Sequence, residues 1–125
     1  MRRKTEQRDA IRAVLLDAER PLNAQEVLER AQRCVPGLGI ATVYRNLKAM
    51  VEHGALATVE LPNEPSRYER ADMEHHHHFQ CTECQRVFDI EGCSEHIDKL
   101  APKGFTVEHH EVVLYGRCPE CPESP

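Results

Sequence analysis

The sequence predicts an α+β protein built from two small units, with helices in its first half and strands in its second. Apolar residues in the first half recur at three- and four-residue steps, which is the period of a helix. The second half instead contains short runs of β-branched and aromatic residues, together with two C-x-x-C pairs. A chain of 125 residues divided in two leaves each unit marginal alone, so we expect cross-links or a partner subunit to stabilise them.

Three amphipathic stripes predict three helices in the first half. We expect Thr5 and Asn23 to cap the first and second helices, and Gly54 to end a third helix at 40–53. Pro36 and Gly37 favour a turn before that third helix. The stripes consist of Ala10, Ile11, Val14, Leu15 and Ala18, then Ala24, Val27, Leu28 and Ala31, and finally Ile40, Val43, Leu47, Met50 and Val51.

After Gly54 the apolar period changes to two, which predicts strands at 56–61 and 66–69 joined by a turn. Three helices followed by a β-hairpin is the element order of a winged helix-turn-helix. We therefore expect a winged-helix domain at 1–70, a charged linker at 71–74 and a second, α/β domain at 75–125. In that domain we expect strands at 77–80, 86–90 and 112–115, a helix from Ser94 to about Leu100, and a disordered tail at 119–125.

Charge is divided unevenly along the chain. Residues 1–58 hold ten Lys and Arg against seven Asp and Glu, a net of +3, whereas residues 59–125 hold six against fourteen, a net of −8. This favours an anion-binding unit joined to a cation-binding unit, although two ordinary solvated faces would give the same pattern. No stretch is apolar enough to predict a membrane span or a secretory signal, so we expect a cytoplasmic protein.

Four of the six cysteines form the pairs Cys81/Cys84 and Cys118/Cys121. Two C-x-x-C turns can supply the four thiolates of a structural zinc site, because each turn directs two sulfur atoms at one ion. A redox C-x-x-C or unrelated free thiols are the alternatives. Disulfides are not expected in the cytoplasm, and Cys34 and Cys93 are left over.

Four consecutive histidines precede the first cysteine pair, at 75–78. On a strand, alternate side chains point to opposite faces, so one run could serve two metal sites or simply be a solvated polar stretch. Further nitrogen and oxygen ligands within folding reach are Glu69, Asp89, His96, His109 and His110. Such ligand sets suit zinc, iron(II) or manganese.

Three motifs together resemble the ferric uptake regulator (Fur) family of metal- and peroxide-responsive repressors. They are A-T-V-Y-R-N-L at 41–47, H-H-H-H-F-Q-C-T-E-C at 75–84 and Y-G-R-C-P-E-C at 115–121. The resemblance extends from about Thr5 to Cys121. It implies that the chain is a DNA-binding regulator and not an enzyme.

The resemblance also implies a role for each candidate ligand. It assigns structural zinc to Cys81, Cys84, Cys118 and Cys121, a regulatory metal to Glu69, His76, His78 and Asp89, and an additional metal to His75, His77, His96 and His110. The all-histidine additional site favours zinc over manganese, although iron(II) could fill the regulatory site and manganese could bind in vitro. Many relatives have a fifth regulatory ligand, a histidine, where this chain has Pro21. The regulatory site could then be four-coordinate, or Glu19 could substitute as the fifth ligand. The missing histidine also argues against peroxide sensing, which relies on histidine oxidation at iron.

The helix at 40–53 is the expected recognition helix of a homodimer that binds a palindromic, AT-rich operator in double-stranded DNA. The residues expected at the DNA are Arg8, Thr42, Tyr44, Arg45 and Lys48. The sequence thus predicts a zinc-responsive repressor of metal-homeostasis genes. Iron- and peroxide-responsive regulators of the same family are the near alternatives, and a metal buffer, a chaperone or a zinc enzyme are the distant ones.

Overall fold

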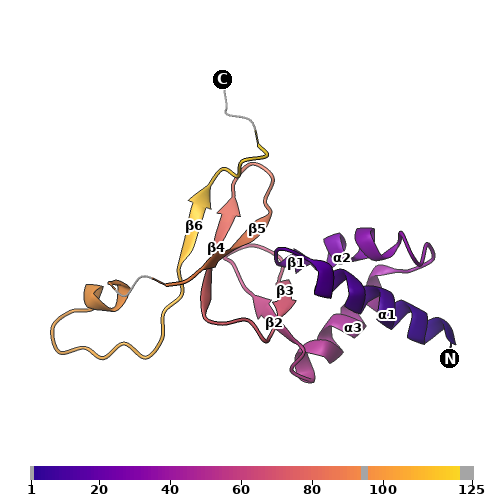
Figure 1. The fold of residues 1–125 in the computed structure, drawn as a ribbon, viewed down its shortest axis with the longest axis horizontal. Coiled ribbons are helices and arrows are strands. Elements are labelled where there is room, and N and C mark those ends of the chain that lie inside the picture. Colours follow the sequence, from indigo (N-terminus) through magenta and orange to yellow (C-terminus); the bar gives the residue numbers. More distant parts are fainter. Residues whose placement is uncertain (1, 94–95, 122–125) are drawn as a thin grey trace. The chain divides into compact units, whose positions relative to one another are not determined.

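The computed structural model describes residues 2–93 and 96–121. The chain divides into two compact units, and the boundary falls between Met73 and Glu74. Helices dominate the first unit and strands the second, which confirms the α+β prediction (Figure 1). No helix among the described residues is long and apolar enough to cross a membrane.

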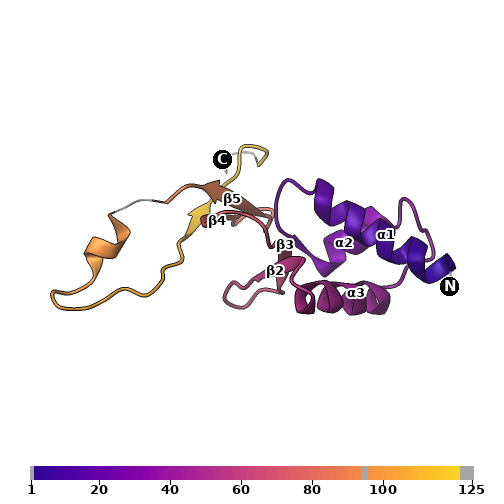
Figure 2. The same ribbon diagram turned by 60° about the horizontal axis from the view of Figure 1, so that its bottom comes forward.

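The helical unit contains α1 (Arg2–Asp17), α2 (Ala24–Ala31) and α3 (Ile40–Glu52). Helix α2 packs against both α1 and α3, as Figures 1 and 2 show from two sides. The predicted stripes form the core, since their buried members point into the space between the helices. The buried core residues are Ile11, Leu15, Leu22, Ala24, Val27, Leu28, Ala31, Leu38, Val43, Leu47, Met50 and Leu56.

Capping residues define where the second and third helices begin and end. The Asn23 side chain accepts a hydrogen bond from the backbone N–H of Glu26 at 2.8 Å, and the Glu26 carboxylate accepts one from the Asn23 backbone at 3.1 Å. This reciprocal capping box satisfies two N–H groups that the first turn of α2 would otherwise leave unbonded. Gly54 follows the end of α3 with a φ of 81°, a left-handed conformation that glycine adopts without strain.

A three-stranded antiparallel sheet completes the helical unit. Its strands are β1 (Leu22–Asn23), β2 (Leu56–Val59) and β3 (Arg67–Arg70), and β3 lies in the centre. β2 and β3 form the predicted hairpin, with Thr58 paired with Tyr68. The three helices and the hairpin together make the winged helix-turn-helix architecture expected from the sequence.

The strand-rich unit contains β4 (His76–Cys81), β5 (Val87–Glu91) and β6 (Val113–Gly116), with the short 3-10 helix η1 (Ile97–Leu100). β4 is the central strand, antiparallel to β5 and parallel to β6 (Figure 1). Gly116 allows close packing at the end of β6, because a Cβ atom there would lie 3.0 Å from the Phe79 ring. The histidine run therefore occupies the start of the central strand, where residues from β5 and from the segment before β6 can reach it.

Three local predictions differ from the structure. Thr5 lies inside α1, not at its start, because the preceding Arg3 and Lys4 are good helix formers and nothing interrupts the helix there. Strand β1 was not expected, since it has only two residues. The helix predicted from Ser94 is represented by η1 alone, and Ser94 itself, like residues 122–125 of the predicted tail, lies outside the described residues.

Candidate metal centres and nucleic-acid surface

The four paired cysteines lie together at the ends of β4 and β6. Sγ of Cys81 is 3.6 Å from that of Cys121, and Sγ of Cys118 is 3.9 Å from Cys84 and 3.5 Å from Cys121. A tetrahedral zinc with Zn–S bonds of about 2.3 Å separates its sulfur ligands by about 3.8 Å. The spacing and the thiol chemistry both fit zinc, and four sulfur ligands leave no position for a substrate.

Neighbouring groups favour the deprotonated, thiolate form of Cys81 and Cys84. Backbone N–H groups of Cys84 and Cys118 donate to Sγ of Cys81 at 3.5 and 3.4 Å, which lowers the pKa of Cys81 to about 6. Burial raises the pKa of Cys84, but hydrogen bonds from Arg86 outweigh that effect and bring it below its usual value. The neighbouring Cys118 thiol raises the pKa of Cys121 to about 12. Zinc therefore has to displace the Cys121 proton. The affinity of the four-cysteine site for zinc should accordingly rise with pH.

A second cluster, the nitrogen–oxygen cluster, consists within this unit of His76, His78 and Asp89. Nε2 of His76 and Nε2 of His78 lie 3.3 and 3.4 Å from Oδ1 of Asp89, which is opposite His78 in the β4–β5 register. Nδ1 of His76 is 2.7 Å from the backbone oxygen of Glu74. That contact places the His76 proton on Nδ1, so Nε2 is the unprotonated nitrogen, the form that binds a metal.

The remaining predicted regulatory ligand, Glu69, belongs to β3 of the helical unit. At the position of the missing histidine, Pro21 is buried and Arg20 forms an ion pair with Glu26 at 2.7 Å. Neither Pro21 nor Arg20 can therefore replace an imidazole ligand. Glu19 is exposed on the same segment.

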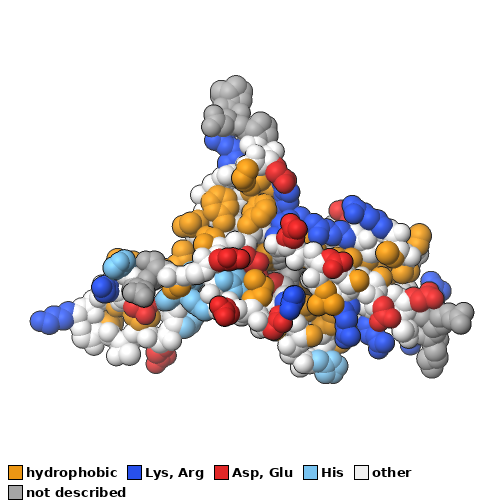
Figure 3. Space-filling view, in the orientation of Figure 1, with side chains coloured by type: hydrophobic (Ala, Val, Ile, Leu, Met, Phe, Trp, Pro, Cys, Tyr) orange, Lys and Arg blue, Asp and Glu red, His pale blue; other side chains and the backbone are white. Residues whose placement is uncertain are grey.

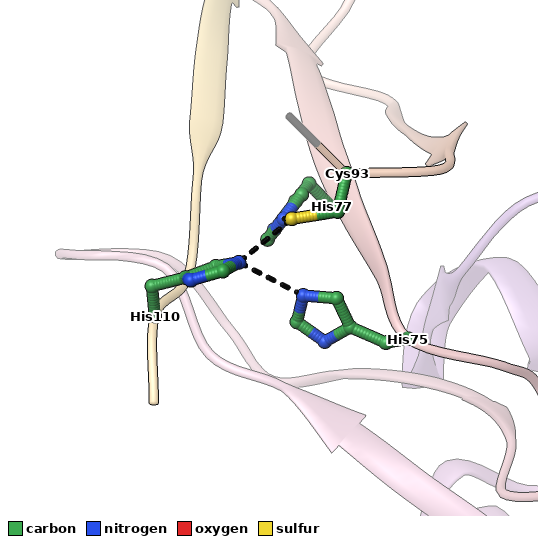
Figure 4. Close-up of side chains that lie close together, drawn as sticks. All are labelled: His75, His77, Cys93 and His110. Carbon is green, nitrogen blue, oxygen red and sulfur yellow. Dashed lines mark hydrogen bonds between the residues drawn. The ribbon is translucent and has the colours of Figure 1, made fainter. Parts of the chain in front are cut away.

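Figure 4 shows a third cluster, the histidine–thiol cluster. It comprises His75, His77, Cys93 and His110, whose ligand atoms all lie within 4.8 Å of one another. Because side chains alternate along a strand, His77 points to the face of β4 opposite His76 and His78. Nε2 of His110 is 3.0 Å from Nε2 of His75 and 2.8 Å from Sγ of Cys93. Burial lowers the pKa of His77, and the rings of His75 and His110 lower it further, which favours neutral imidazole.

The family resemblance implies that His96 belongs to this cluster, whereas in the structure Cys93 lies there. The reason is the register of the β4–β5 hairpin, in which His76 pairs with Glu91. Cys93 lies two residues beyond Glu91, and because β5 runs antiparallel to β4 it therefore lies beside the residues that precede β4. Counting outward from the tight turn after Cys81 would have found this, because each residue on β4 determines its partner on β5.

The exposed face of α3 carries the residues predicted to bind DNA. Val43, Leu47 and Met50 are buried, whereas Tyr44 is 52% exposed and therefore not a core residue. The other predicted DNA contacts on this helix are the half-buried Thr42 and the exposed Arg45 and Lys48, and Arg8 is exposed on α1. Figure 3 shows Lys and Arg side chains over the helical unit, and most of the histidines visible in this view on the strand-rich unit.

Comparison with known proteins places this geometry in a family. The model of the ferric uptake regulator family matches residues 2–115. The peroxide operon regulator of Bacillus subtilis (strain 168) is 31% identical over 123 residues, covering 95% of this chain and 83% of that protein.

Solved structures give the same result. A zinc-bound manganese uptake regulator superposes with a TM-score of 0.77 at 29% identity, covering 90% of this chain and 87% of that one. The Campylobacter jejuni peroxide stress regulator superposes with a TM-score of 0.62 at 28% identity, covering 95% and 91%. The chain belongs to the ferric uptake regulator family.

Proposed function

We propose that this chain is a metal-dependent transcriptional repressor that binds palindromic duplex DNA as a homodimer and releases it in response to peroxide. The nitrogen–oxygen cluster carries the proposal, because its donor set suits a redox-active metal. Several similar proteins carry names that describe peroxide-responsive regulators. These names favour the peroxide-responsive alternative over the zinc-responsive function that the sequence predicted.

The ligand atoms of the nitrogen–oxygen cluster favour iron(II) as the bound metal. Two imidazoles and one carboxylate, His76, His78 and Asp89, are the ligand combination of many non-haem iron(II) sites, which keep positions open for small oxidants. Iron(II) held by these residues would supply peroxide-reducing chemistry beside the ligating rings, so His76 and His78 would be the groups open to oxidation. This supplies oxidisable histidines despite the missing ligand at Pro21.

We infer that metal binding acts on DNA affinity by restricting how the two units are oriented. In this proposal Glu69 of the helical unit joins the ligands of the strand-rich unit, as the family resemblance implies. A metal that binds residues of both units shifts the population towards one relative orientation. Metal-free protein keeps the freedom of the segment at 71–74 and binds DNA weakly.

Exposed apolar residues on the strand-rich unit support the homodimer. Leu114 is 51% and Tyr115 55% exposed on β6, which lies at one edge of the sheet. Leu100 and Phe105 are 83% and 72% exposed in the segment before it. Large apolar side chains left exposed in this way indicate surface that a second copy of the chain covers.

Arg45→Ala should weaken metal-dependent DNA binding by about 1–3 kcal/mol, the usual contribution of an arginine that contacts a base. Arg45 is exposed on α3 and donates a hydrogen bond to the Thr42 hydroxyl at 3.0 Å, so its removal leaves the core intact. Lys103→Ala, which removes an exposed charge from the strand-rich unit, is the control. Fluorescence anisotropy on a duplex selected from a random-sequence pool measures the effect, and equal losses in both variants would count against the α3 interface.

Peroxide should release DNA from the iron(II)-loaded protein and leave the manganese-loaded protein bound. Manganese(II) can hold the same ligands but does not drive the oxidation of histidine. The measurement is anisotropy under anaerobic conditions before and after a stoichiometric pulse of hydrogen peroxide, with mass spectrometry of the peptide containing His76 and His78. DNA binding that responds to buffered zinc but not to peroxide would instead support the zinc-responsive function, which the thiol in the histidine–thiol cluster favours.

A further inference from the structure

Arg86 lies against the four-cysteine cluster without being one of its ligands. It immediately precedes β5, and its backbone oxygen accepts a hydrogen bond from the backbone N–H of Cys81 at 2.9 Å. This bond fixes the Arg86 backbone in the turn between β4 and β5, beside the first C-x-x-C pair. The Arg86 side chain is 27% exposed, so most of it packs against the protein.

Each of the three guanidinium nitrogens of Arg86 has its own partner. Nε donates to Sγ of Cys84 at 3.1 Å, and one terminal nitrogen donates to Sγ of Cys118 at 3.7 Å. The other terminal nitrogen forms an ion pair with the Glu120 carboxylate at 2.6 Å. The guanidinium also lies over the Phe88 ring, 5.7 Å from its centre, which favours one orientation of the planar group. Arg86 therefore contacts both C-x-x-C turns at once.

The charge of the cluster gives these hydrogen bonds a purpose. Four thiolates around one divalent zinc ion leave two negative charges uncompensated, and Cys81 and Cys118 are buried, so water can compensate only part of them. Two backbone N–H groups already donate to Sγ of Cys81. Arg86 supplies side-chain donors to Cys84 and Cys118, and its guanidinium is always positively charged.

Hydrogen bonds to a thiolate sulfur also lower its reactivity, because they stabilise the electron pair with which the sulfur attacks. When peroxide oxidises a thiolate, an S–O bond forms and the O–O bond breaks, and the products are a sulfenic acid and hydroxide. The oxidised sulfur is no longer a thiolate ligand. One such reaction at Cys84 or Cys118 would therefore begin the loss of zinc.

We propose that Arg86 is a positioning residue of the four-cysteine site, which holds one sulfur of each C-x-x-C pair and slows the loss of zinc to peroxide. Glu120 orients the guanidinium from the second pair. The importance of this protection rests on the proposed function, because a repressor that is oxidised at its regulatory metal has to keep the zinc that stabilises its fold.

The rate of zinc release by hydrogen peroxide tests this proposal in the full-length protein, with a colorimetric zinc indicator. Arg86→Gln should release zinc roughly 10- to 100-fold faster than wild type, the range by which loss of an outer hydrogen-bonding partner weakens a metal site. Arg86→Lys keeps the charge but offers a single nitrogen, so its rate should lie between the two. Arg117→Gln is the matched control, because it removes an exposed arginine next to Cys118, and it should behave as wild type.

Alkylation of individual cysteines distinguishes a direct effect on the sulfur atoms from a general loosening of the strand-rich unit. Short reactions with excess iodoacetamide, followed by peptide mass spectrometry, give the initial alkylation rate of each cysteine. In Arg86→Gln the rates at Cys84 and Cys118 should rise relative to the rate at Cys81, which keeps its backbone donors. Zinc content and circular dichroism before the reaction check that each variant is folded.

Wild-type zinc release from Arg86→Gln would overturn the proposal. Equal acceleration of alkylation at Cys81, Cys84 and Cys118 would also overturn it, because Arg86 would then act only through the stability of the fold. Full rescue by Arg86→Lys would contradict the role of the guanidinium geometry. None of these measurements uses DNA or iron(II), so their failure is distinguishable from failure of the proposed function.

Discussion

Cys81→Ser should remove the structural zinc and unfold the strand-rich unit. Cys81 is fully buried, and its sulfur accepts hydrogen bonds from two backbone N–H groups as well as contacting Cys121. Zinc binding by four cysteines contributes about 10–16 kcal/mol in small zinc domains, and this free energy is also folding free energy. The described part of the strand-rich unit has few buried apolar residues, so burial of apolar surface cannot replace the free energy lost with zinc.

The Cys81→Ser variant should contain no tightly bound zinc. Protease should rapidly cleave it within the strand-rich unit, which begins at Glu74, and it should elute as a monomer in gel filtration. The helical signal of α1, α2 and α3 should remain, because the first unit has its own core. Cys34→Ser, at an exposed position, is the matched control and should behave as wild type. A Cys81→Ser protein that keeps one equivalent of zinc and resists protease would refute the structural role of the four-cysteine site.

His76→Ala should abolish metal-dependent DNA binding while leaving the dimer intact. His76 contacts Asp89 through Nε2 and the Glu74 backbone through Nδ1, and it is not part of the four-cysteine cluster. Loss of an outer hydrogen-bonding partner alone reduces metal affinity about 10- to 100-fold, so loss of a ligand should reduce it more. Calorimetry with manganese(II) measures the metal affinity, and anisotropy measures the operator affinity.

His109→Ala is the matched control, since His109 is exposed in the same unit and lies outside the three clusters. It should bind metal and DNA as the wild-type protein does. If His76→Ala bound the operator with unchanged affinity, the nitrogen–oxygen cluster would not be the regulatory site.

Sequence periodicity predicted most of the helical unit because burial there follows simple rules. The predicted stripe of α2 is buried, and so are Val43, Leu47 and Met50 of α3, whereas Ile40 at the start of α3 is exposed. Asn23 caps the start of α2 and Gly54 follows the end of α3, as capping chemistry requires. β1 was not predicted because two residues are too few to show the alternation of apolar and polar side chains that indicates a strand. Its pairing with β3 comes from tertiary contact and not from local sequence.

The metal clusters were harder to predict because their members come from different elements. Each C-x-x-C pair was recognisable because it lies within four consecutive residues. The histidine run predicted ligands on both faces of a strand, because side chains alternate along it. Cys93 was missed because its position depends on the β4–β5 register and not on its distance in sequence from the histidines. The hydrogen bond between Val112 and His77, which indicates the protonated nitrogen of that ring, has no signature in the sequence.

We propose that a metal bound at His76, His78 and Asp89 switches DNA binding by the helical unit. The most direct measurement is the anisotropy of a labelled, selected operator with wild-type protein that retains its structural zinc, at one fixed salt concentration. We expect tight binding with iron(II) or manganese(II), and weak binding after a chelator removes that metal but leaves the four-cysteine zinc. Equal affinity with and without the regulatory metal would contradict this proposal.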